Sequence, residues 1–84
     1  MDIAVTTLVE RIARTLAGLD HSANGAGSET SAATSVDETW RAYLAQADAV
    51  LRTIREPSGA MSAAGDPAIW SAMLDAAIAE SETV

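Results

Sequence analysis

Hydrophobic residues recur every three or four positions at the start of the chain, which is the period of an amphipathic helix. The spacing predicts a helix over residues 1–19 with Asp2 as N-cap. Its inward stripe would consist of Val5, Leu8, Val9, Ile12, Leu16 and Leu19. Glu10 and Arg14 have the order that favours an i,i+4 ion pair on the outer side. Because residues 3–9 are rich in β-branched side chains, a strand there is the alternative.

The helical period stops after Leu19. Residues 20–36 are short, polar and rich in Gly and Ser, and this length without periodicity exceeds the usual loop of a compact domain. The sequence therefore predicts a flexible linker over 20–36, with His21 as an exposed residue of that linker.

A second helix is predicted over residues 37–56. Ser35 and Glu38 have the spacing of a capping box, and Pro57 ends the helix. The inward face would carry Trp40, Tyr43, Leu44, Ala47, Val50, Leu51 and Ile54. The outer face would carry Arg41, Asp48, Arg52 and Arg55.

Proline and glycine divide the rest of the chain into two helices. Pro57 at the first helical position and Gly65 as the stop predict a short helix over 57–65. An N-cap followed by an N1 proline, Asp66–Pro67, then begins a helix over 66–81. Its core face would carry Ile69, Trp70, Met73, Leu74, Ala77 and Ile78, and the opposite face Ser71, Asp75 and Glu82.

These elements predict a single all-α domain over residues 1–84. It would be a small helical bundle of three main helices plus one short helix, with a long Gly/Ser-rich loop after the first. Hydrophobic residues make up 49% of the chain, but 19 of them are Ala and there is no Phe. The core therefore has few large side chains, and Trp40 and Trp70 are expected to anchor it, with Met61 and Met73 as filler.

The residue types exclude most catalytic and metal chemistry. The chain has no Cys, no Lys and one His, so it has no thiolate zinc site, no P-loop and no histidine cluster. The stretch from Asp20 to Gly25 begins like an EF-hand loop, but Ser31 stands where calcium needs a bidentate glutamate. His21 has no rigid Ser–His–Asp setting. The sequence predicts neither an enzyme nor a cofactor or metal.

Charge is the feature that points to a partner. The net charge is −7, and all five bases lie in the first 55 residues. Residues 56–84 carry only acids, which are the predicted partner-binding residues: Glu56, Asp66, Asp75, Glu80 and Glu82. Such a chain is repelled by nucleic acid and anionic lipid, so a basic protein surface is expected instead. No apolar run reaches the ~20 residues of a membrane span, and the N-terminus lacks a basic signal region, so a cytoplasmic location is expected.

The second half of the chain resembles a known sequence pattern. AVLRTIREP at 49–57 is followed by Met61, Ala64–Gly65, Trp70 and Met73. That order is similar to one near the C-termini of small uncharacterised proteins of proteobacterial phages and prophages. The resemblance spans roughly residues 40–80 and rests on structural motifs. The Lys-free, Ala- and Arg-rich composition also suits a high-GC bacterial host.

The resemblance implies two classes of function. One is a phage-type protein that binds and inhibits a host protein or ribonucleoprotein complex with a basic surface, as anti-CRISPR proteins do, by steric blocking assisted by charge. The alternative is a self-associating phage accessory or scaffold protein, a possible homodimer without an inhibitory role. Salt dependence separates the two, because charge-assisted blocking weakens as salt rises.

Overall fold

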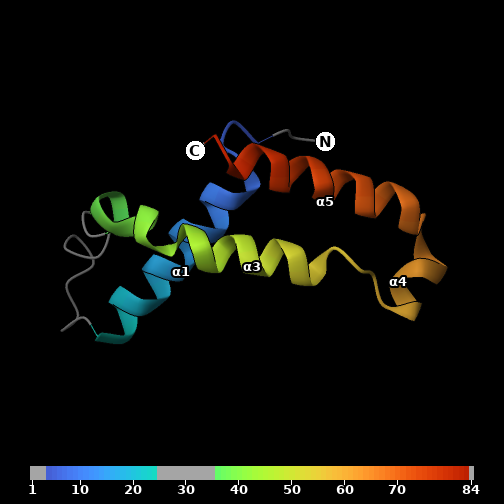
Figure 1. Cartoon of the computed structure of the whole chain (residues 1–84). Coiled ribbons are helices and arrows are strands. Elements are labelled where there is room, and N and C mark those ends of the chain that lie inside the picture. Colours follow the sequence, from blue (N-terminus) through green and yellow to red (C-terminus); the bar gives the residue numbers. More distant parts are fainter. Residues whose placement is uncertain (1–3, 25–35, 84) are drawn as a thin grey trace.

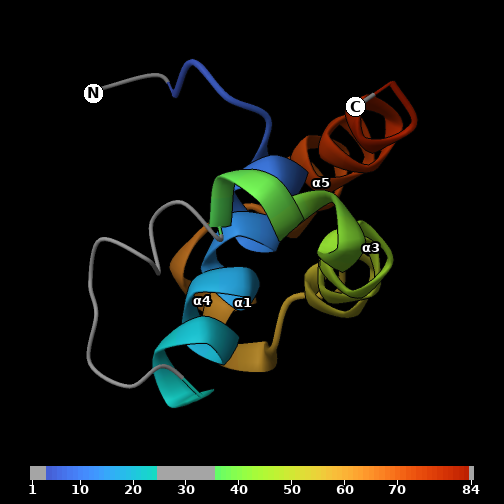
Figure 2. The same cartoon turned by 90° about the vertical axis from the view of Figure 1, so that its left-hand side faces the viewer.

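The computed structural model describes residues 4–24 and 36–83, and these residues form helices and no strand. The helices are α1 (Leu8–Asn24), α3 (Leu44–Ile54), α4 (Gly59–Ala64) and α5 (Pro67–Ser81). Residues 36–39 are helical and lead through the 3-10 turn η1 (Trp40–Tyr43) into α3. α3 and α5 run antiparallel and are joined through α4, while α1 crosses the pair (Figures 1 and 2). The all-α prediction is confirmed.

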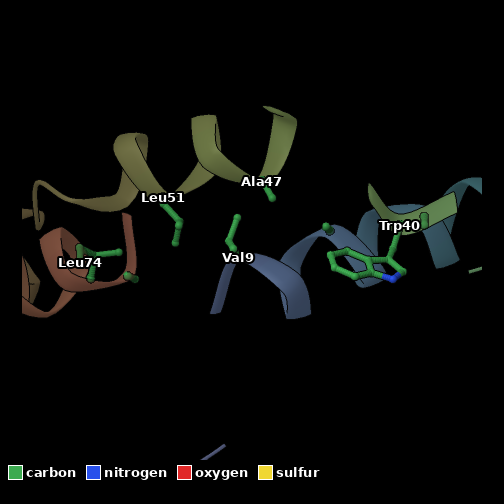
Figure 3. Packing of buried hydrophobic residues seen from close by; sticks show 8 residues of the cluster. Val9, Trp40, Ala47, Leu51 and Leu74 are labelled. Atoms are coloured by element: carbon green, nitrogen blue, oxygen red, sulfur yellow. The ribbon is translucent and has the colours of Figure 1, made fainter. Parts of the chain in front are cut away.

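The core is small, and two of the three α1 residues buried in it are alanines. Val9, Ala13 and Ala17 follow one another at i,i+4 spacing and are fully buried. Against them pack Trp40, Ala47, Leu51, Leu74 and Ala77. Figure 3 shows Val9 pointing toward Leu51 and Ala47 of α3, with Leu74 beside Leu51 and Trp40 near the other end of α1. Small side chains on α1 allow the other helices to approach its backbone closely.

The predicted first helix is displaced in the structure. Residues 4–7 are irregular, and α1 begins at Leu8, where the Thr7 hydroxyl accepts a hydrogen bond of 3.2 Å from the Glu10 N–H. Thr7 therefore caps the helix, and the proposed cap Asp2 lies outside the described residues. The predicted stripe is also wrong at its ends, since Val5 is fully exposed and Leu19 is 64% exposed. The face formed by Val9, Ala13 and Ala17 is turned to the core, and Leu8 and Ile12 of the predicted stripe pack against this core while half-buried.

The predicted linker begins too early. Residues 20–24 are the last turn of α1, so Asp20 does not open a calcium-type loop. The Tyr43 hydroxyl donates to an Asp20 carboxylate oxygen at 2.8 Å. His21 is half-buried, and its Nε2 lies 2.9 Å from the Thr39 hydroxyl. These contacts with residues 39–43 stabilise the last turn of α1, although its sequence lacks the apolar spacing typical of a helix. Residues 25–35, including the capping residue Ser35, lie outside the described part of the chain.

The predicted helix over 37–56 is interrupted by η1. In a 3-10 turn the side chains at i and i+3 eclipse, which directs both Trp40 and Tyr43 toward α1. Trp40 is 3% exposed, and the guanidinium carbons of Arg14 and Arg41 lie 5.0 and 4.3 Å from its ring centre. The expectation that Trp40 anchors the core is confirmed. Its two cation–π contacts add to the attachment of this turn to α1.

The start of α5 is where the sequence predicts it, whereas the start of α4 is not. Asp66 caps α5 by accepting from the Ala68 N–H at 2.9 Å, and Pro67 is the first helical residue, as predicted. α4 begins later than predicted, because the Ser58 hydroxyl is its N-cap and accepts from the Met61 N–H at 3.3 Å. Gly65 ends α4 with a φ of −158°, which is extended backbone and not a left-handed cap.

The interior glycine of α1 provides a test of this packing. A Cβ added at Gly18 would lie 3.7 Å from a methyl carbon of Val36, an ordinary van der Waals contact. We expect Gly18→Ala to raise the free energy of unfolding by about 0.5–1 kcal/mol, because alanine loses less backbone entropy in a helix. Thermal melting followed by circular dichroism checks this. A lower melting temperature would mean that α1 and residue 36 are closer than the structure has them.

Candidate partner-binding surface

One side of α5 is occupied by polar contacts to the end of α3. The Trp70 indole N–H donates to the Ile54 carbonyl at 2.7 Å, and the Ser71 hydroxyl donates to the Arg55 carbonyl at 3.1 Å. Arg55 also forms a bidentate ion pair with Asp75, at 2.5 and 3.1 Å. Trp70 and Ser71 thus donate hydrogen bonds to carbonyl groups at the C-terminal end of α3, which have no partner within the helix. Ser71 and Asp75 therefore face α3, and the prediction that they lie opposite the core face is wrong.

The same ion pairs shift the pKa of the acids that take part. Hydrogen bonding by Arg55 lowers the pKa of Asp75, and hydrogen bonding by Arg52 lowers the pKa of Asp48. The Ser81 hydroxyl also donates to Asp48 at 3.2 Å, which ties the end of α5 to α3. Both carboxylates therefore stay ionised to a lower pH than an unpaired aspartate would, and each is held in an ion pair that belongs to the fold.

Most of the arginines form ion pairs or ring contacts within the protein. Arg14 pairs with Glu10 at 2.9 Å and with Asp37 at 2.7 Å, and Arg52 pairs with Asp48 at 2.7 Å. The i,i+4 pairs predicted from the sequence are confirmed. Because Arg55 pairs with Asp75 and Arg41 stacks on Trp40, little positive charge is left to compensate the remaining acids.

The five predicted partner-binding acids do not behave alike. Asp75 is held by Arg55, and Asp66 accepts the backbone N–H groups at the start of α5. Glu56, Glu80 and Glu82 are exposed, and their carboxylates make no hydrogen bond or close ion pair among residues 4–24 and 36–83. Glu56 and Glu82 act on Arg55 and Arg52 only through longer-range attraction, which raises the pKa of each arginine further. The acidic surface therefore has three accessible carboxylates. We name Glu56, Glu80 and Glu82 the acidic triplet.

An apolar cavity lies in the corner between α4 and α5, next to Glu56 in the sequence. It has a volume of about 240 Å³ and is lined by Pro57, Met61, Gly65, Asp66, Pro67, Ile69, Trp70 and Met73. Three large apolar side chains of this corner are exposed to solvent: Met61 at 43%, Ile69 at 59% and Met73 at 64%. The prediction that Ile69 and Met73 belong to the core is wrong. α4 itself buries no residue, which leaves the corner open.

A second hollow continues the first along α5. It has a volume of about 490 Å³ and shares Trp70 and Met73 with the corner cavity. Its other wall is the irregular segment 4–7 and the first turn of α1, and its charged lining residues are Arg11 and Glu80. We call the two hollows together the α5 groove. A weak signal for the groove is present in the sequence, since residues 66–79 are more apolar than one buried helix face requires.

The described residues hold neither a cluster of metal ligands nor a membrane-spanning helix. Residues 4–24 and 36–83 contain no group of three or more His, Asp or Glu side chains placed to hold a metal ion. Within the same ranges, no helix is long and apolar enough to cross a bilayer.

Comparison with known proteins does not add a relative to this picture. No protein-family model, curated protein or solved structure matches the chain. The geometry of the groove and of the acidic triplet is therefore the basis for the function proposed next.

Proposed function

We propose that the protein binds a basic surface of a host protein or ribonucleoprotein complex and blocks it, as a small phage-type inhibitor of the anti-CRISPR kind would. The observation that carries the proposal is the acidic triplet. Its three exposed carboxylates lie in a segment without a base, while Arg52 and Arg55, the arginines nearest to it in the sequence, are paired within the fold. Exposed charge of one sign steers a protein to a surface of the opposite sign.

The mechanism would be steric blocking without chemistry. The triplet would accelerate encounter, and the body of the α3–α5 hairpin would then cover the surface that the complex uses for nucleic acid. Three carboxylates, one just after the end of α3 and two at the end of α5, do not copy the regular charge spacing of a nucleic-acid backbone. The proposal is therefore charge-assisted occlusion and not mimicry.

Removing the triplet should weaken capture of the partner about tenfold. Each exposed charge pair contributes about 0.5 kcal/mol, so three give about 1.5 kcal/mol, which is close to the value of about 1.4 kcal/mol for one decade in Kd. The test is a pull-down from a high-GC proteobacterial lysate with the wild type and with Glu56→Gln/Glu80→Gln/Glu82→Gln, at low and high salt, read by mass spectrometry. The captured complex is then assayed for nucleic-acid binding with and without the protein.

The matched control is Asp2→Asn/Glu29→Gln/Glu38→Gln, which removes the same number of acids from the first half of the chain. It should retain capture. Equal loss in both triple variants would show that net charge alone matters, and unchanged capture by the triplet variant would contradict the proposal.

Self-association without an inhibitory role is the second candidate, and the exposure of Ile69 and Met73 favours it. Apolar contact between copies would change little with salt. A dimer by sedimentation that persists at high salt, together with a pull-down that recovers only the bait, would establish this alternative.

A further inference from the structure

We propose that the α5 groove receives the apolar side of a cationic amphipathic helix of the partner. The inference rests on the proposed function and identifies the segment that the site binds. The groove combines an open apolar trough with acids at its edge, and the carboxylates of two of these acids, Glu56 and Glu80, form no hydrogen bond or close ion pair among the described residues.

The corner cavity has the size and lining of a pocket for an apolar side chain. A cavity of about 150 Å³ holds a benzene ring, and this one measures about 240 Å³. Met61 and Met73 form two of its walls, and methionine adapts to apolar side chains of different shape. Trp70 forms another, and its ring is held in place by the hydrogen bond to the Ile54 carbonyl.

The groove has the form that helix recognition needs. The corner cavity and the second hollow share Trp70 and Met73, so side chains from successive turns of one helix could enter both. Recognition of a helix in a groove uses apolar anchors at i, i+3, i+4 and i+7.

Charge identifies the occupant as cationic and disfavours a second copy of this chain. Asp66 and Glu80 line the groove, and Glu56 precedes the lining residue Pro57. Arg11 is the single base among the lining residues. Two copies that met through this face would bring together two base-free segments, residues 56–84 of each, and like charges across an interface are repulsive.

The test uses a defined probe, a leucine–lysine peptide of about 14 residues with leucine at helical spacing. Titration into methyl-labelled protein is followed by NMR, with the indole signal of buried Trp40 as reference. We expect the methyl signals of Met61 and Met73 to move and the Trp40 signal to stay. A leucine–glutamate peptide and a serine–lysine peptide should each bind at least tenfold more weakly, since one lacks the charge and the other the anchors.

A pair of variants distinguishes binding in the groove from nonspecific binding to any exposed apolar side chain. Met73→Ser should weaken the leucine–lysine peptide about tenfold, whereas Leu19→Ser should not, although both side chains are 64% exposed. Circular dichroism confirms that both variants remain helical. The wild-type methyl shifts supply a readout that needs no variant.

Several results would overturn the inference. They are unmoved Met61 and Met73 signals, equal binding of the leucine–glutamate peptide, equal loss in the two serine variants, and a dimer whose methionine signals change on dilution. If the peptide fails while capture from lysate still depends on the acidic triplet, the groove is wrong and the proposed function stands.

Discussion

Replacing Trp40 with alanine should bring the protein close to unfolding at room temperature. Truncation of a buried aromatic side chain costs about 3–5 kcal/mol, and a domain of this length has about 4–13 kcal/mol in total. Trp40 is 3% exposed and is the largest side chain of an eight-residue core. Because it joins η1 to α1, its loss would also remove two arginine contacts. Thermal melting by far-ultraviolet circular dichroism should show a decrease in melting temperature of at least about 12 °C.

The control is the same truncation at Trp70. That side chain is half-buried, and the carbonyl to which it donates lies where water can replace it. Trp70→Ala should therefore cost clearly less than Trp40→Ala. If the two variants melt together, the core does not have its centre at η1.

Enlarging Ala13 to leucine should also destabilise the fold. Ala13 is fully buried between Val9 and Ala17 on the face of α1 that meets the other helices. Additional carbon atoms in a filled core force neighbouring helices apart, at a cost of about 1–3 kcal/mol. The melting temperature should decrease by on the order of 10 °C.

Ala45→Leu makes the matched comparison, because Ala45 is exposed on α3. Leucine is nearly as good a helix former as alanine, so this variant should melt close to the wild type. A stable Ala13→Leu protein would contradict the close approach of α1 to its neighbours.

Sequence reasoning succeeded where the signal is local. Asp66 and Pro67 specify the start of α5 with a side-chain cap and a fixed φ, and both are neighbours in the chain. The ion pairs Glu10–Arg14 and Asp48–Arg52 depend only on helical spacing. The start of α1 was missed because an apolar period continues through residues 3–8 although the cap is Thr7.

The errors come from contacts between distant residues. Hydrophobicity alone does not distinguish an alanine face that packs closely from a neighbouring stripe of larger residues, so Ala13 and Ala17 were overlooked. The charge pattern predicts Asp75 as an accessible acid, because its partner Arg55 lies twenty positions away in the sequence. The face of α5 that contacts α3 is therefore not the predicted one. Because Ser71 and Asp75 face α3, Met73 is left exposed, and this exposure opens the α5 groove.

α4 contributes no residue to the core, and this has a consequence for the evolution of the protein. α4 buries no residue, and α5 is joined to α3 by contacts that bypass it. Substitutions at Met61 can therefore reshape the corner cavity without touching the core. Under the proposed function, stability and target choice would be carried by separate parts of the chain, so descendants could change targets through α4 while they inherit the fold intact.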